Sequence, residues 1–198
     1  MNRCVRGAMT IGRDSLQLAV LAVGAICVLT SCNTSDDGDT NPITSLTAEQ
    51  SIATDAPTGF DTCKDIPQSV LDSEKLRRRS EANSDANGGI KWRGCRYGRT
   101  DGYFATITTT NLTVEMTRDK HFPEAAEFEI AGRAAISTRQ FDGPNIKDAC
   151  TVNVAMQGGS LDINLLNPAS NRETGSIDSC QLARTLAEKI VPTIPSNA

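Results

Sequence analysis

The apolar segment Leu16–Leu29 constrains the rest of the chain most, because it decides the compartment in which the chain folds. The segment has 14 residues and follows a positively charged start that contains Arg3, Arg6 and Arg13. A run of this length is typical of the core of an export signal and falls short of the ~20 residues of a membrane span. We therefore expect residues 1–31 to be a signal peptide; a short membrane anchor that is never cleaved is the alternative.

The residues that follow this segment predict how the exported chain is held. The sequence LTSC at Leu29–Cys32 resembles a bacterial lipobox, in which the cysteine sulfur carries a diacylglycerol and the cysteine becomes the new N-terminus. The resemblance implies lipidation of Cys32 and a location at the extracytoplasmic face of the cell membrane, anchored by ~0.8 kcal/mol per buried CH₂. Residues 32–59 are rich in small polar residues without apolar periodicity, so we expect a disordered polar tether.

Export also predicts the use of the cysteines. The chain has seven; two leave with the signal and Cys32 is assigned to the lipid, so four remain. An even number of cysteines in an exported chain is typical of disulfides, and the spacing of these four does not match a zinc site. We expect two disulfides among Cys63, Cys95, Cys150 and Cys180.

Between residues 60 and 195, two pairs of segments show the pattern of β-hairpins. Each pair combines strand-like residues with a turn that contains glycine. The pairs are residues 90–98 and 103–111 around Asp101–Gly102, and residues 150–157 and 160–167 around Gly158–Gly159.

Residues 127–140 show the clearest alternation in the chain. Apolar residues occupy even positions from Phe128 to Ile136, and polar or charged residues, among them Arg139, occupy odd positions. A period of two with one polar face predicts a single half-buried antiparallel strand. Gly132 falls on the apolar face and indicates a bulge or a close approach by a packed element.

Three helices are predicted around these strands. The first covers residues 68–78, with Arg77–Arg79 at its C-terminal end, where the helix dipole favours positive charge. A short helix is expected within residues 112–125. A closing helix begins at Asp178, which is suited to cap its N-terminus, and ends before Pro192.

The order of these elements predicts an α+β domain at residues 60–195. We expect a twisted antiparallel sheet of about five strands, covered by the N-terminal and C-terminal helices and stapled by two disulfides. Pairs 63–95 and 150–180 would each join a helix start to a strand and close a loop worth roughly 3–4 kcal/mol. Three pairings are possible from the sequence, and the crossed ones stay open.

The four-cysteine arrangement is similar to a family of cell-envelope lipoproteins of unknown function from actinobacteria, of the mycobacterial and nocardial type. The resemblance implies a surface lipoprotein with two disulfides, and it brings no catalytic residue with it. The segments that carry it are DTCKDIP, WRGCRYG, IAGRAA, ACTVNVAM and DSCQLARTLAEKIVPTIP, in this order between residues 60 and 195.

The sequence gives little sign of catalysis. His121 is the only histidine and lies in a polar turn, while Glu127 and Glu129 alternate on a strand face that we expect to be solvated. The net charge of −4 argues against general nucleic-acid binding, which needs a basic footprint. We therefore expect a protein that is not an enzyme and has neither a cofactor nor a metal.

Two functions fit these observations. The first is a binding or interaction module whose partner is an envelope protein, a glycan or a lipid. Its candidate surfaces are the Arg77–Arg79 end and the region of Trp92, Arg93, Arg96 and Arg99. The second is a carrier of a hydrophobic envelope lipid or small ligand, in a cavity between sheet and helices.

Overall fold

The computed structural model describes residues 51–140 and 143–198. The predicted signal peptide at residues 1–31, the lipidation site Cys32 and most of the predicted tether lie outside the described residues. The described end of the tether, residues 51–59, contains no helix or strand. Its Ala56 is buried, and its Ala53 carbonyl accepts a hydrogen bond of 2.7 Å from Asn111 Nδ2.

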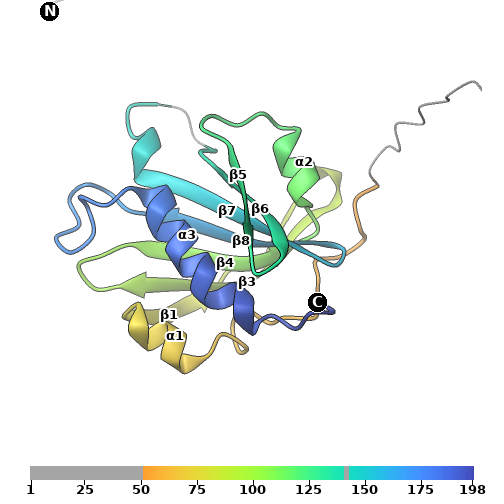
Figure 1. The fold of residues 1–198 in the computed structure, drawn as a ribbon, viewed down its shortest axis with the longest axis horizontal. Coiled ribbons are helices and arrows are strands. Elements are labelled where there is room, and N and C mark those ends of the chain that lie inside the picture. The colour runs from red at the N-terminus through yellow and green to blue at the C-terminus, as the bar shows by residue number, and fades with distance from the viewer. Residues whose placement is uncertain (1–50, 141–142) are drawn as a thin grey trace, which may run out of the picture. The chain divides into compact units, whose positions relative to one another are not determined.

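The described residues form an α+β fold around one open antiparallel sheet (Figure 1). The sheet has eight strands, more than the five or so expected, in the order β1-β3-β4-β8-β7-β6-β5, with β2 also paired to β3. The strands are β1 Leu76–Glu81, β2 Ser84–Ala86, β3 Ile90–Arg99, β4 Phe104–Thr110, β5 Ala126–Ile130, β6 Arg133–Thr138, β7 Ala149–Met156 and β8 Gly159–Leu166. The α-helices are α1 Gln68–Ser73, α2 Val114–Arg118 and α3 Ser179–Ile190.

The helix α3 lies across one face of the sheet, over β7 and β8 (Figure 1). It begins as predicted, because the Asp178 carboxylate accepts hydrogen bonds from the backbone N–H groups of Cys180 and Gln181. Its apolar stripe meets the alternate residues of the two strands that face it. The fully buried side chains at this contact include Val152, Val154, Leu161, Ile163, Leu165, Ala183, Leu186 and Ile190.

The two predicted hairpins and the local disulfide pairing are confirmed, but the turn of the second hairpin is Gln157–Gly158 and not Gly158–Gly159. Strands β3 and β4 pair antiparallel, and so do β7 and β8, in which Met156 lies opposite Gly159. The disulfides are Cys63–Cys95 and Cys150–Cys180, with Cα atoms 5.3 and 5.0 Å apart. Each therefore ties the segment before or at the start of a helix to a buried strand, as expected.

The predicted first helix at residues 68–78 is wrong beyond its first half. Helix α1 ends at Ser73, and Lys75 has a φ of 55°, which no helix continues through. Arg77–Arg79 lie in β1, an edge strand with only Leu76 buried. Charged residues are typical of exposed edge strands, so this strand lacks the alternation that would have revealed it. Helix α1 has no buried residue, and the N-terminal helix does not cover the sheet as predicted.

The single strand predicted at residues 127–140 is instead the hairpin of β5 and β6. Ala131 and Gly132 form the turn with φ values of 49° and 78°, which explains the glycine by backbone conformation and not by a bulge. Arg139 was predicted on the solvated face and is buried, with 3 % of its side chain exposed. In residues 51–140 and 143–198, no helix is both long and apolar enough to span a membrane.

Candidate functional site

The face of the sheet opposite α3 is polar, and a pocket opens on it. Alternate residues of β4, β7 and β8 point away from the core, so that Thr108, Asp162 and Asn153 lie in one row across three neighbouring strands. Asp162 is directly opposite Thr108 on one side and Asn153 on the other. Side chains that face each other in this way have Cβ atoms roughly 4.5–5.5 Å apart. We call the pocket over this row the polar-floor pocket.

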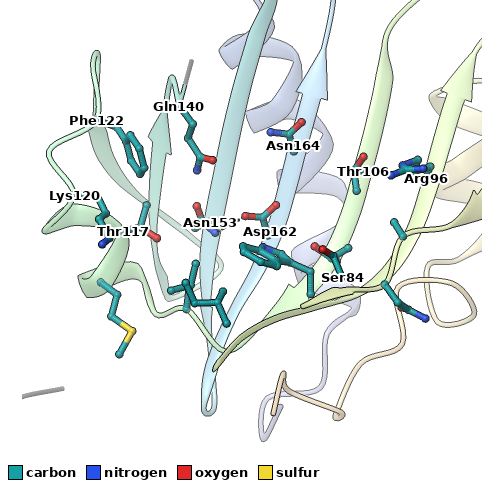
Figure 2. A pocket seen from close by; sticks show the side chains of 17 residues that line it. Ser84, Arg96, Thr106, Thr117, Lys120, Phe122, Gln140, Asn153, Asp162 and Asn164 are labelled. Atoms are coloured by element: carbon teal, nitrogen blue, oxygen red, sulfur yellow. Dashed lines mark hydrogen bonds between the residues drawn. The ribbon is translucent and has the colours of Figure 1, made fainter. Parts of the chain in front are cut away.

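The polar-floor pocket has a volume of about 460 Å³, within the range of small-molecule sites. Its floor is the row just described together with Thr106 and Asn164 of the next row. Figure 2 shows Asn153, Asp162, Asn164 and Thr106 projecting from neighbouring strands toward the same space. Its walls are apolar and aromatic, formed by Ile90, Trp92, Leu112, Met116 and Phe122.

Local sequence explains how the walls are held. One wall is the start of β3, where β2 folds back through the glycine turn Asn87–Gly89 and pairs with it. The other is α2, which packs over β6 and β7 and is capped by Thr113, whose hydroxyl accepts the Met116 N–H at 3.2 Å. The Arg118 guanidinium donates to both carboxylate oxygens of Glu127, at 2.8 and 2.7 Å, and fixes the end of α2 to β5.

Asp162 is the unusual group of the floor. Only 8 % of the residue is exposed, and its carboxylate accepts one hydrogen bond, from Asn153 Nδ2 at 3.0 Å (Figure 2). Within residues 51–140 and 143–198, no Lys, Arg or His forms an ion pair with it. Burial without a cation disfavours the charged form and raises the pKa of Asp162 to about 6, although the Asn153 hydrogen bond opposes the shift.

Two further polar atoms of the floor are buried without a partner in the described part of the chain. They are Thr108 Oγ1 and Asn153 Oδ1. Buried polar atoms are nearly always hydrogen-bonded, so two orphans beside an uncompensated carboxylate mark this row as a place built for something other than stability.

The other buried charged groups are paired and have structural roles. Arg139 donates to Glu124 and Asp178 at 2.7 and 2.6 Å, beside a second hollow of about 560 Å³ along α3. The Glu74 carboxylate accepts from Tyr103 Oη at 2.7 Å and pairs with Lys189, which ties α3 to the end of α1. Arg139 and Glu74 have hydrogen-bond and ion-pair partners within the fold, so we assign them a structural role.

Only some of the candidate binding residues predicted from the sequence lie at the polar-floor pocket. Trp92 and Arg96 belong to β3 and line the polar-floor pocket, whereas Arg93 pairs with Asp85 at 2.5 Å and Arg99 pairs with Glu173. Arg77 pairs with Asp72 at 2.8 Å.

Among the groups considered for catalysis, His121 is exposed in the turn after α2. Glu127 is held by Arg118, and Glu129 is exposed. In the part of the chain that the structure describes, no three His, Cys, Asp or Glu residues are grouped to hold a metal ion.

Sequence reasoning missed the floor itself. It used the apolar alternation of residues 150–167 to define the core and did not follow the polar residues in between. The predicted turn at Gly158–Gly159 would place Asn153 opposite Asn164, and only the observed turn at Gln157–Gly158 places it opposite Asp162. The available signal was the presence of Asn153, Asp162 and Asn164 inside two otherwise apolar strands, where such residues are uncommon.

Comparison with known families gives one match. A family model described as "Protein of unknown function (DUF3558)" matches residues 27–193, which is most of the chain and includes all strands and helices described above. No curated protein and no solved structure matches the chain. The chain therefore belongs to the DUF3558 family of proteins of unknown function.

Proposed function

We propose that this protein is a lipid-anchored, non-catalytic binding module at the extracytoplasmic face of the cell membrane, and that the polar-floor pocket is its binding site. The observation that carries the proposal is the buried floor row of Thr108, Asp162 and Asn153, which lines a pocket of ligand size and contains an uncompensated carboxylate and two buried polar atoms without partners. Convergent polar groups inside an apolar rim are typical of binding sites.

The anchor rests on the N-terminal sequence. The apolar segment before Leu29–Cys32, the lipobox-like sequence and the polar run after it support export, lipidation and a tether. The two disulfides support the same compartment, because they persist in oxidising surroundings. His121, the only histidine of the chain, lies exposed in the turn after α2, which supports a role in binding over catalysis.

The alternative of a hydrophobic lipid carrier fits the pocket less well. An acyl chain over the floor would leave Thr108 Oγ1 and Asn153 Oδ1 without hydrogen-bond partners and the Asp162 carboxylate with only the bond from Asn153, at a cost of about 1–3 kcal/mol for each unsatisfied polar group. The apolar side chains of the walls are grouped around this polar floor.

Replacing Cys32 with alanine should remove the anchor. We expect the Cys32→Ala chain to be unprocessed or released from the membrane, because no acyl chain can be attached to alanine. The measurement is fractionation of cells into membrane and soluble material, with the mass of the N-terminal peptide read by mass spectrometry. Retention of the variant in membranes at the size of the mature protein would contradict lipidation at this residue. Cys4→Ala, in the predicted signal, is the matched control and should leave anchoring unchanged.

A photo-crosslinking residue at the pocket should capture the natural ligand or partner. We expect a crosslinker at Lys120, exposed at the pocket mouth, to give a defined covalent adduct on intact cells. The same crosslinker at Lys64, an exposed residue outside the pocket, is the control. Equal adducts from both positions, or none from Lys120, would count against the pocket as the binding site.

A further inference from the structure

The hydrogen-bond donors and acceptors on the pocket floor indicate which chemical group of a ligand would bind there. Asn153 Nδ2 donates to Ser160 Oγ at 3.2 Å and to Asp162 Oδ2 at 3.0 Å, which uses both of its hydrogens. These two bonds fix the orientation of the amide and leave Asn153 Oδ1, an acceptor, buried without a donor. Turning the amide around would lose both bonds, because the Ser160 hydroxyl donates its hydrogen to the Leu112 carbonyl at 2.8 Å and the ionised Asp162 carboxylate has none to donate.

The same shortage of donors exists on either side of Asn153 in the row. The Asp162 carboxylate accepts a single hydrogen bond in the described residues, although its two oxygens have room for several. Thr108 Oγ1, directly opposite Asp162, has no partner and is able to accept or donate. Three neighbouring residues that line the pocket therefore carry acceptor atoms with too few donors, and one of them is a carboxylate without a cation.

An ammonium group matches this inventory. It brings three hydrogen-bond donors and one positive charge. A neutral hydroxyl brings one donor, and water supplies hydrogen bonds without compensating the charge of the carboxylate. We propose, resting on the pocket being the binding site as argued above, that the ligand of this protein carries a primary amine, whose ammonium group binds between Asp162, Asn153 and Thr108.

The walls and mouth of the pocket refine this proposal. Trp92, Phe122 and Met116 offer apolar and aromatic surface to the carbon skeleton that carries the amine, and aromatic faces attract cations. Arg96 and Lys120 are exposed at the mouth and are the other charged groups of the lining. Their positive charge disfavours a ligand with several amines, so the inference is a small monoamine. The raised pKa of Asp162 agrees with a carboxylate that lacks the cation it is built to meet.

The fluorescence of Trp92 can be used to measure ligand binding in the pocket. Trp92 is the only tryptophan in the sequence and lines the pocket, so its fluorescence in the purified full chain reports on occupancy. The probes are benzylamine and benzyl alcohol, which have the same ring and differ in charge and donors. We expect saturable binding of benzylamine near neutral pH and binding of benzyl alcohol weaker by about tenfold or more, as for a charged hydrogen bond against a neutral one.

Two variants separate a floor contact from a general effect. Asp162→Asn keeps the shape and removes the charge, and should weaken benzylamine about tenfold to a hundredfold with little effect on benzyl alcohol. Thr108→Val keeps the shape, removes one hydroxyl and should weaken benzylamine several-fold. Glu129→Gln, an exposed charge change on β5, should leave both probes unchanged. Circular dichroism confirms that each variant is folded.

The outcomes distinguish this inference from the proposed function. Equal affinity for the two probes, or unchanged benzylamine affinity in Asp162→Asn, would overturn the amine and leave a pocket that binds by other means. Absence of any response of Trp92 to benzylamine would also overturn the amine. The proposed function is decided separately by the Lys120 crosslink, whose adduct does not depend on the chemistry of the ligand.

Discussion

Replacing Arg139 with methionine is expected to lower the free energy of unfolding by about 2–4 kcal/mol, because buried neutral acceptors lose a charged donor at about 1–3 kcal/mol each. Its carboxylate partners Glu124 and Asp178 are 44 % exposed and stay solvated. The Arg139 guanidinium joins three parts of the fold. Besides Glu124 and Asp178, it donates to Ser179 Oγ at 2.8 Å and to the carbonyl oxygen of Ala149 at 2.9 Å, with longer bonds to the carbonyls of Ile146 and Lys147. Without it, buried acceptors at the start of β7 and at the N-terminus of α3 lose their donor.

The measurement is equilibrium unfolding in guanidinium chloride with the disulfides intact. Arg172→Met is the matched control, because Arg172 is 81 % exposed and its pair with Asp101 at 3.1 Å is worth about 1 kcal/mol or less. A loss below about 1 kcal/mol for Arg139→Met would show that the cluster does not hold the sheet and α3 together.

Replacing Asp162 with asparagine is expected to stabilise the protein, and more so at higher pH. The pKa of Asp162 is raised from 3.8 to about 6 on folding, so between these values the folded state binds more protons than the unfolded state. Stability contributed by this group therefore falls as the pH rises from about 4 to about 6 and stays low above that. Asparagine does not titrate, and the variant should gain about 3 kcal/mol at about pH 7.5 and about 1 kcal/mol at about pH 4.5.

The interpretation of this pH dependence depends on the other charged groups around the pocket. Arg96 and Lys120 line the same pocket, and neither forms an ion pair with Asp162 in the described residues. Asp85→Asn provides a control with the opposite sign. The Arg93 guanidinium lowers the pKa of the exposed Asp85 carboxyl, so its loss should slightly destabilise the protein at neutral pH. Equal effects of Asp162→Asn at both pH values would contradict a buried, uncompensated carboxylate.

The core of the fold could be predicted from the sequence because its signals are local. The β7–β8 hairpin combines strict alternation with a glycine turn, and α3 combines an N-cap with an apolar stripe at helical spacing. Placing Cys150 on the core face and Cys180 in the first turn of α3 favoured the local disulfide pairing, which the structure confirms, over the crossed pairings. Each of these features depends on residues close together in the chain.

The errors arose where tertiary contacts outweigh local pattern. The Arg-rich segment of β1 resembles a helix end and becomes a strand because β3 offers a partner, with Arg78 opposite Tyr97. Arg139 follows the alternation of a solvated face, but acceptors from β7 and α3 surround it only after folding. The floor of the pocket has the same origin, since Thr108 meets Asp162 through a pairing of β4 with β8 that no local pattern indicates.

Retaining an uncompensated carboxylate in a buried row costs stability, and such costs are typical of sites that bind something. An NMR titration of the Asp162 side-chain carboxyl, with and without benzylamine, tests directly whether this carboxylate is uncompensated and binds an amine. We expect a midpoint near pH 6 in the protein alone, shifted to lower pH when the amine is bound. A midpoint near the ordinary value of about 4 that benzylamine does not move would contradict it.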